Sequence, residues 1–273
     1  MIAKLRDAGA TEVIQHGASW FEADSYLRRE FIENQAPARG VDVGDPKAGS
    51  GLEESVNVYV PPFDHPLIWE GAGGMIGEIA RQLPPREDGE QRVFPADVVV
   101  CSVGGGGLFN GMIDGLEKYI KASSSSSSST PAKNVRVLAV ETRGADSLAF
   151  SLRQGKLSSL SAIESQATSL GALCVAEQTL ANALSPPAGI EVISVVGSDA
   201  EGARGVVRLA DETRLQVELA CGISLEVVVG ERLKQLIPDL GPETRVVVVV
   251  CGGSNITAEM IAEYRLKLQE GWV

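Results

Sequence analysis

Short apolar runs alternate with longer segments of mixed polarity through most of the chain. Four runs rich in valine and isoleucine predict buried β-strands, at residues 97–102, 135–140, 191–196 and 245–251. The segments between and after the apolar runs predict helices, at residues 67–83, 108–121, 148–154, 173–183, 198–211, 223–236 and 257–269. Ser198 and Glu201 have the spacing of a capping box. The alternation predicts an α/β fold with a mainly parallel, twisted sheet and helices on both faces.

The first 60 residues are organised differently. Residues 2–8 predict a helix, and residues 11–15 predict a short strand. Ser19 is placed to cap a helix that runs to about residue 33. Residues 56–60 predict a further strand, which Pro61 and Pro62 would end.

Three segments interrupt this pattern. Residues 35–55 and 84–95 are polar and contain several prolines and glycines, so they predict surface insertions. The seven serines at residues 123–129 predict a flexible loop without chemistry of its own. The sequence contains no internal repeat that would indicate a solenoid.

The composition excludes several classes of partner. The 273 residues carry a formal net charge of −12, with an isoelectric point of about 4.7. Such a charge gives no electrostatic reason to bind nucleic acid or an anionic membrane. No segment reaches the roughly 20 apolar residues of a membrane helix, and the charged N-terminal residues resemble no signal peptide. We therefore expect a cytoplasmic protein.

The cysteines and histidines do not form a metal-binding pattern. Cys101, Cys174, Cys221 and Cys251 form no Cys-x-x-Cys pair, and the chain has only two histidines. A zinc site is therefore disfavoured, and a chain of this kind has no need of disulfides. From the residues alone, each cysteine is expected to act as a small buried hydrophobic side chain.

The clearest candidate for chemistry is a run of four glycines between a predicted strand and a predicted helix. Gly104, Gly105, Gly106 and Gly107 leave their backbone N–H groups unshielded and permit positive φ. Together with the start of the following helix, such N–H groups form a binding site for a phosphate. The alternative is a flexible turn, although four glycines cost considerable chain entropy unless something orders them.

Neither nucleotide-binding fingerprint fits this glycine run. A dinucleotide fingerprint requires a third glycine five residues after the first, but Phe109 and Asn110 occupy the two possible positions. A P-loop requires Gly-Lys-Ser/Thr, but Gly111 is followed by Met112 and Ile113. A small phosphate group held by backbone atoms remains, as in a pyridoxal phosphate site.

Two weaker signals follow other predicted strands. The segment 250–255 reads Val-Cys-Gly-Gly-Ser-Asn after the most apolar strand, and a plain turn explains it equally well. Glu141 ends the strand at residues 135–140, where it is either a ligand or a solvated acid. Because ligands of parallel sheets gather at the carboxyl ends of the strands, both are candidate site residues.

Six motifs in order give the chain a family resemblance. They read PPFDHPLIWEG (61–71), SVGGGGL (102–108), VETRGADS (140–147), TSLGA (168–172), ELACG (218–222) and VCGGSNIT (250–257). In this set the chain resembles the L-serine dehydratases, fold-type II pyridoxal-phosphate enzymes related to threonine deaminase and the tryptophan synthase β chain. The resemblance extends from about residue 1 to residue 261.

The resemblance implies a domain division and a set of site residues. Residues 1–57 would be part of a small α/β domain with a linker, and residues 58–273 a large cofactor-binding domain that is incomplete at its N-terminal side. Pyridoxal 5′-phosphate would be held by Gly104, Gly105, Gly106, Gly107, Leu108 and Cys251. Cys251 would face the pyridine nitrogen, and an uncharged partner leaves that nitrogen largely unprotonated. A monovalent cation, usually potassium, would be bound by the carboxylate of Glu141 and the carbonyl oxygens of Gly104, Ala145, Leu170 and Ala172.

The chain also departs from the family pattern. The family's Ser-x-Lys-x-Arg-Gly stretch, with its Schiff-base lysine, does not occur, because Lys4 lies between Ala3 and Leu5. The Ser-Ser-Gly-Asn-Ala-Gly loop that binds the substrate carboxylate does not occur either. A smaller departure is Leu219, where a proline is usual. No catalytic residue is therefore assigned, and serine and threonine preference stay open.

Three functions fit these observations. In the first, the chain would be a truncated pyridoxal-phosphate-dependent L-serine dehydratase, which would act on an amino acid as a homodimer but is expected to be inactive as written. Alternatively, it is a non-catalytic relative that binds a phosphate compound or regulates another protein. The third possibility, an unrelated nucleotide-binding domain, is disfavoured by the failed fingerprints.

Overall fold

The computed structural model describes residues 2–33, 57–84, 94–123, 133–229 and 231–273. These residues form two compact units, Met1–Pro61 and Pro62–Val273. The predicted insertions at 35–55 and 84–95 and the serine run lie largely outside the described residues. Among the described helices, none is long and apolar enough to cross a membrane.

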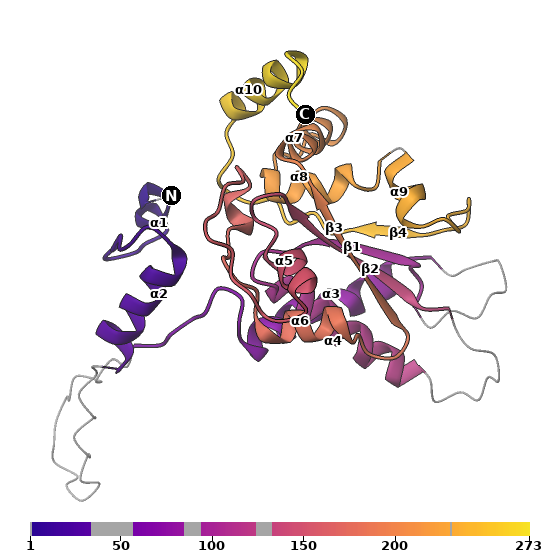
Figure 1. The fold of residues 1–273 in the computed structure, drawn as a ribbon, viewed down its shortest axis with the longest axis horizontal. Coiled ribbons are helices and arrows are strands. Elements are labelled where there is room, and N and C mark those ends of the chain that lie inside the picture. The colour runs from indigo at the N-terminus through magenta and orange to yellow at the C-terminus, as the bar shows by residue number, and fades with distance from the viewer. Residues whose placement is uncertain (1, 34–56, 85–93, 124–132, 230) are drawn as a thin grey trace, which may run out of the picture. The chain divides into compact units, whose positions relative to one another are not determined.

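In its described residues, the first unit contains helices but no strand (Figure 1). Helix α1 spans Ile2–Asp7, and α2 spans Trp20–Leu27 and continues into a π-helical turn at Arg28–Glu33. The hydroxyl of Ser19 accepts the N–H of Glu22 at 3.3 Å, so the predicted cap is confirmed. The strand predicted at 11–15 is wrong, and so is the one predicted at 56–60 over its described residues 57–60, because a strand is stable only when it pairs with another.

The second unit is built on a four-stranded parallel sheet in the order β3-β2-β1-β4 (Figure 1). The strands are β1 (Val98–Ser102), β2 (Val135–Thr142), β3 (Ile190–Gly197) and β4 (Val246–Val248). The chain moves outward from β1 through β2 to β3, and then returns to place β4 on the other side of β1. The predicted parallel α/β fold is confirmed.

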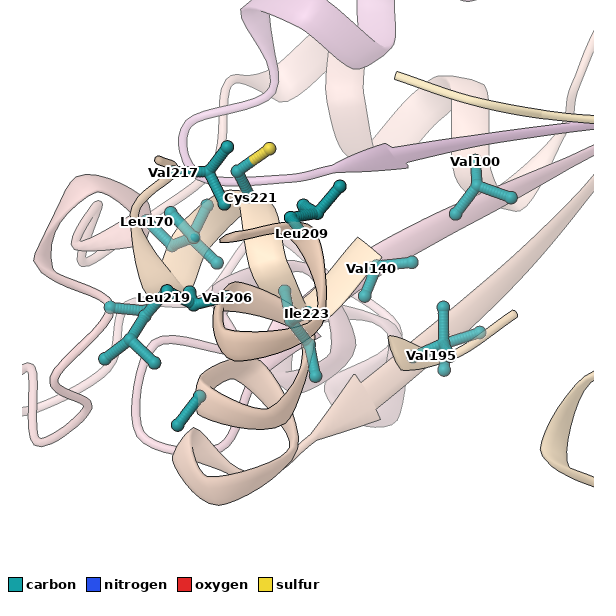
Figure 2. Close-up of a cluster of buried hydrophobic side chains, with 14 of the residues drawn as sticks. Val100, Val140, Leu170, Val195, Val206, Leu209, Val217, Leu219, Cys221 and Ile223 are labelled. Carbon is teal, nitrogen blue, oxygen red and sulfur yellow. The ribbon is translucent and has the colours of Figure 1, made fainter. Parts of the chain in front are cut away.

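Alternate residues of the strands face opposite layers of helices. Val98 and Val100 belong to a buried cluster with residues of α7 (Asp199–Arg208), α8 (Leu219–Glu226) and α10 (Ala258–Gln269), part of which Figure 2 shows. Val99 and Cys101 pack into a second cluster, with residues of α3 (Pro66–Gln82) and α4 (Gly107–Ser123). The strands are mostly apolar because both faces of the sheet are covered.

The remaining elements connect these layers. The short helix α5 (Ser147–Gln154) follows β2, and a single 3-10 turn lies at Thr168–Leu170. Helix α6 spans Glu177–Leu184 and begins four residues later than predicted. The capping box at Ser198 and Glu201 is confirmed, and α7 continues into a π-helical turn at Leu209–Thr213.

Two predicted elements have different limits. The helix predicted at 223–236 is two helices, α8 and α9 (Glu231–Leu236), and α8 begins earlier than expected. Helix α8 ends at Glu226, and Val227, Val228 and Val229 lie in the break, since β-branched side chains next to a glycine favour a helix least. The strand predicted at 245–251 is only three residues long, because the chain turns away before Gly252 and Gly253, both at positive φ.

Candidate active site

The topology places a site at the carboxyl ends of β1 and β4. Helix α4, which follows β1, packs on one face of the sheet, and α10, which follows β4, packs on the other, so the loops after these two neighbouring strands diverge. Gly104 to Gly107 follow β1, and Cys251, Gly252 and Gly253 follow β4. The two glycine-rich segments singled out in the sequence therefore line one crevice.

The glycine loop presents a row of unused hydrogen-bond donors. In the described chain, no hydrogen bond is donated by the backbone N–H groups from Gly104 to Leu108. The first helical bond of α4 runs from the N–H of Asn110 to the carbonyl of Gly106 at 2.8 Å. These donors, at the positive end of a 17-residue helix, suit a phosphate group.

Three of the glycines are required by close contacts. Gly106 has a φ of 102°, and a Cβ there would overlap the side chain of Thr179. A Cβ on Gly105 would overlap the ring of Phe63, and one on Gly107 would lie 2.9 Å from the Cα of Phe63. The loop is therefore a packed element rather than a flexible turn.

A pocket of about 370 Å³ opens beside this loop. All six residues predicted to bind the cofactor lie along it, together with Phe63, Ser169, Glu218 and Cys221. No lysine, arginine or histidine is present among the residues described as lining it. The pocket has the size of a small-ligand site, and both the N–H donors of the glycine loop and the exposed Cys251 line it.

Glu218 is the charged side chain of the pocket. Its carboxylate Oε1 accepts the N–H of Asn255 at 2.6 Å, and its Oε2 accepts the hydroxyl of Ser169. Its backbone N–H donates to the carbonyl of Gly252 at 2.9 Å. One residue thus joins the segments around Ser169 and around Gly252.

Glu141 is fully buried at the end of β2. Its two carboxylate oxygens accept the N–H groups of Leu148 and Ala149, both at 2.8 Å, at the start of α5. Burial raises the pKa of Glu141 to about 8, and the nearby carboxylate of Asp146 adds to this, although the two N–H groups and Arg153 oppose it. Of the two alternatives for Glu141, the solvated acid is therefore wrong, and the carboxyl group caps the start of α5.

The residues predicted to bind a cation are partly brought together. Leu170 lies beside Gly104, where an added Cβ would be 3.2 Å from the Cα of Leu170. Ala145 and Leu170 belong to one buried cluster, and the N–H of Ala172 donates to the carbonyl of Leu170 at 2.8 Å. No group of three or more His, Cys, Asp or Glu side chains among the described residues could hold a metal ion. Any cation here would depend on carbonyl oxygens and Glu141.

The cysteines occupy different environments. Cys101 is fully buried, and burial raises the pKa of its thiol to about 12. Cys221 is also buried, Cys174 is half-buried and Cys251 is exposed. The expectation of a buried hydrophobic side chain therefore holds for two of the four, and Cys251 faces the pocket.

Comparisons with known proteins identify the family. Residues 1–252 match the family model described as pyridoxal-phosphate dependent enzyme. The chain belongs to this family. It is 36% identical over 264 residues to an L-serine dehydratase of Saccharomyces cerevisiae, covering 95% of this chain and 68% of the relative. It is 39% identical over 245 residues to a serine dehydratase-like protein of Rattus norvegicus, covering 89% of this chain and 67% of the relative.

Solved structures agree with this assignment. A fungal L-serine ammonia-lyase from Rhizomucor miehei matches with a TM-score of 0.75 and 29% identity, covering 97% of this chain and 70% of that one. A threonine deaminase from Solanum lycopersicum shares the fold, with a TM-score of 0.56 and 23% identity over 78% of this chain and 50% of that one. The resemblance to L-serine dehydratases is confirmed, and the α/β fold is that of the family.

Sequence reasoning gave no role to several pocket residues. Phe63, Ser169, Glu218 and Cys221 all lie within the motifs that carry the resemblance, but nothing about their spacing indicates a shared pocket. In the structure, glycines of other segments approach three of these residues: Gly105 approaches Phe63, Gly104 approaches Ser169 and Gly253 approaches Glu218. Only the folded structure shows which glycine packs against which side chain.

Proposed function

We propose that this chain forms the phosphate- and pyridine-binding part of a pyridoxal-phosphate-dependent L-serine dehydratase site. The observation that carries this proposal is the row of unused N–H donors from Gly104 to Leu108, which opens on the same pocket as Cys251. The family of the chain supports the identity of the ligand. The phosphate of pyridoxal 5′-phosphate would be bound by the glycine loop and α4.

Other residues that line the pocket would contact the cofactor ring or exclude water. The thiol of Cys251 would contact the pyridine nitrogen without carrying charge, and Leu108 and Phe63 would exclude water from the phosphate. When bound, pyridoxal phosphate supplies an electron sink for elimination from an amino acid. The substrate would be L-serine, with L-threonine as the alternative that the family offers, and L-serine would yield pyruvate and ammonia.

These 273 residues alone would not carry out that reaction. The described residues that line the pocket include no lysine, so they offer no amine to hold the cofactor covalently or to move the α-proton of the substrate. The carboxylate-binding loop of the family is not in the sequence, so the substrate would not be oriented. The activity would then require groups that the pocket does not supply.

A monovalent cation, potassium by family, would bind near Glu141, with carbonyl oxygens of Gly104, Ala145, Leu170 and Ala172. The burial of Glu141 and the contact between Gly104 and Leu170 support this assignment. A cation here would fix the segment around Ser169 against the glycine loop. We also assign residues 1–57 to a partial small domain and residues 58–273 to the cofactor-binding domain. We propose that the protein assembles as a homodimer.

The experiment is a binding titration with pyridoxamine 5′-phosphate, which has the phosphate and ring of the cofactor but no aldehyde to react with surface lysines. Calorimetry should give one site per chain, and Gly107→Ala should abolish it because the new Cβ would meet Phe63. Gly241→Ala is the matched control, since nothing lies within 4 Å of that position. Absence of binding to the wild-type chain would refute the proposal.

Turnover is measured separately. Wild-type protein supplied with pyridoxal phosphate, potassium chloride and L-serine should form no pyruvate above the protein-free rate. Turnover that hydroxylamine abolishes would show that these residues are catalytically complete, and would refute the inactive state.

A further inference from the structure

Glu218 holds together the two loops that flank the pocket. Its carboxylate accepts the N–H of Asn255 at 2.6 Å and the hydroxyl of Ser169, from loops separated by more than eighty residues in sequence. A third contact joins the same loops directly, because the side-chain amide of Asn255 donates to the hydroxyl of Thr168 at 3.4 Å. The carboxylate is therefore shared between the loops.

The side chain is not needed by its own helix. Glu218 occupies the N-cap position of α8, where a carboxylate would ordinarily accept N–H groups of the first turn. Its side chain makes no such bond, and instead turns to the pocket, with 9% of the residue exposed. Gly253 makes room for this orientation, because a Cβ at that position would overlap the carboxyl group.

The two loops adjoin the two segments to which the proposed function assigns the phosphate and the pyridine ring. Leu170, next to Ser169, lies against Gly104 at the start of the phosphate loop. Asn255 ends the turn that begins with Cys251, the residue at the pyridine end. A change in the position of one loop relative to the other would alter the distance between the phosphate donors and the thiol.

We propose that Glu218 is a positioning residue, which sets the spacing between the phosphate loop and the Cys251 turn by bonding Ser169 and Asn255 at once. The proposal rests on the proposed function, since it concerns the same pocket. It assigns to Glu218 no contact with the reacting atoms. It requires that ligands spanning the pocket depend on Glu218, and that a ligand confined to the glycine loop does not.

The test compares two probes of different length. Inorganic phosphate would contact only the glycine loop, whereas pyridoxamine 5′-phosphate would extend to the Cys251 turn. Glu218→Ala removes both acceptors, and we expect pyridoxamine 5′-phosphate to bind about tenfold more weakly, because only part of the free energy of the two lost charge-assisted hydrogen bonds is transmitted to the ligand. Phosphate should bind within about twofold of wild type, because its donors are unchanged. Glu218→Gln keeps an acceptor for Asn255 and can donate to Ser169, so it should restore most of the loss.

A control on the same helix isolates the effect from stability. Glu226 ends α8 and pairs with Arg204, away from the pocket, so Glu226→Ala should change neither affinity. Ser169→Ala removes only one partner of Glu218 and is the substitute variant if Glu218→Ala fails to fold. It should weaken the binding of pyridoxamine 5′-phosphate and leave the binding of inorganic phosphate unchanged. Circular dichroism and the unfolding midpoint establish folding of each variant.

The outcomes separate this inference from the proposed function. If wild-type protein binds neither probe, the phosphate site itself is refuted and the inference with it. If wild type binds both but the Glu218 variants lose both equally, or lose neither, the positioning role is refuted and the proposed function stands.

Discussion

The ring of Phe63 lies directly against Gly105, where any side chain would overlap it. Phe63 is itself fixed, because its carbonyl oxygen accepts the N–H of His65 at 3.2 Å and the indole N–H of Trp69 at 2.7 Å. The start of α3 thus determines how closely the phosphate loop can pack. At this position glycine is required by contact, since its φ is not in the left-handed region.

This contact predicts a coupling between two substitutions. Gly105→Ala should destabilise the protein by about 1–3 kcal/mol, the usual cost of overpacking, and weaken phosphate binding. In a Phe63→Ala background the same change should cost less, because the ring is gone. The coupling should exceed about 0.5 kcal/mol, measured by urea unfolding of the four proteins of a double-mutant cycle. Additive effects would show that the ring does not limit the loop.

The buried carboxyl of Glu141 predicts a dependence of stability on pH. Its pKa is raised by burial from 4.5 to about 8, so the folded state binds the proton more tightly than the unfolded chain does. The resulting stabilisation is complete below pH 4.5 and is lost as the pH rises through 8. The unfolding temperature should therefore fall between pH 5 and 8, by about 2–4 °C for each kcal/mol lost.

The control for this dependence is Glu141→Gln, which does not titrate. The amide cannot accept both the Leu148 and Ala149 N–H groups, so the variant should be less stable than wild type at pH 5.5, by about 1–3 kcal/mol. The difference in the free energy of unfolding between the variant and wild type should shrink toward pH 8, because wild type loses the stabilisation that comes from protonated Glu141. Potassium chloride, compared with choline chloride, should reduce the wild-type slope if a cation binds the ionised carboxylate. Parallel slopes for both proteins would assign the dependence to other groups.

Two helical glycines should respond to alanine in opposite directions. Gly205 in α7 lies against the backbone of Gly222 in α8, and a Cβ there would overlap the carbonyl oxygen of Gly222. Gly205→Ala should therefore destabilise the protein by about 3 kcal/mol or more. Gly74 in α3 has nothing within 4 Å, so Gly74→Ala should stabilise by up to about 1 kcal/mol. Equal effects in thermal unfolding would contradict the close approach of α7 and α8.

Local features of this fold could be read from the sequence, and distant contacts could not. The strand at 98–102 was predicted to within one residue, because a strand buried on both faces is continuously apolar. The segment after Arg245 is equally apolar, yet it pairs over only three residues and Val250 is exposed. Nothing in its composition shows where pairing with β1 ends.

The same distinction applies to the site. The glycine run could be recognised from the sequence as a candidate phosphate-binding loop, since few other structures require four consecutive glycines. Glu218 could not be recognised in this way, because its role depends on hydrogen bonds to Ser169 and Asn255, which are distant in sequence and meet it only in the folded chain. Glu141 was recognised as a candidate, but its bonds to the start of α5 became visible only in three dimensions.

The exposure of Cys251 predicts selective protection by a ligand. Cys251 faces the pocket and is exposed, Cys174 is half-buried outside it, and Cys101 and Cys221 are buried. In native protein, iodoacetamide should modify Cys251 first, and pyridoxamine 5′-phosphate should slow that reaction while leaving Cys174 unaffected. Inorganic phosphate should protect less, because it would occupy only the glycine loop. Peptide mass spectrometry over time gives both rates, and equal protection of Cys174 and Cys251 would indicate general stabilisation instead of a ligand beside the thiol.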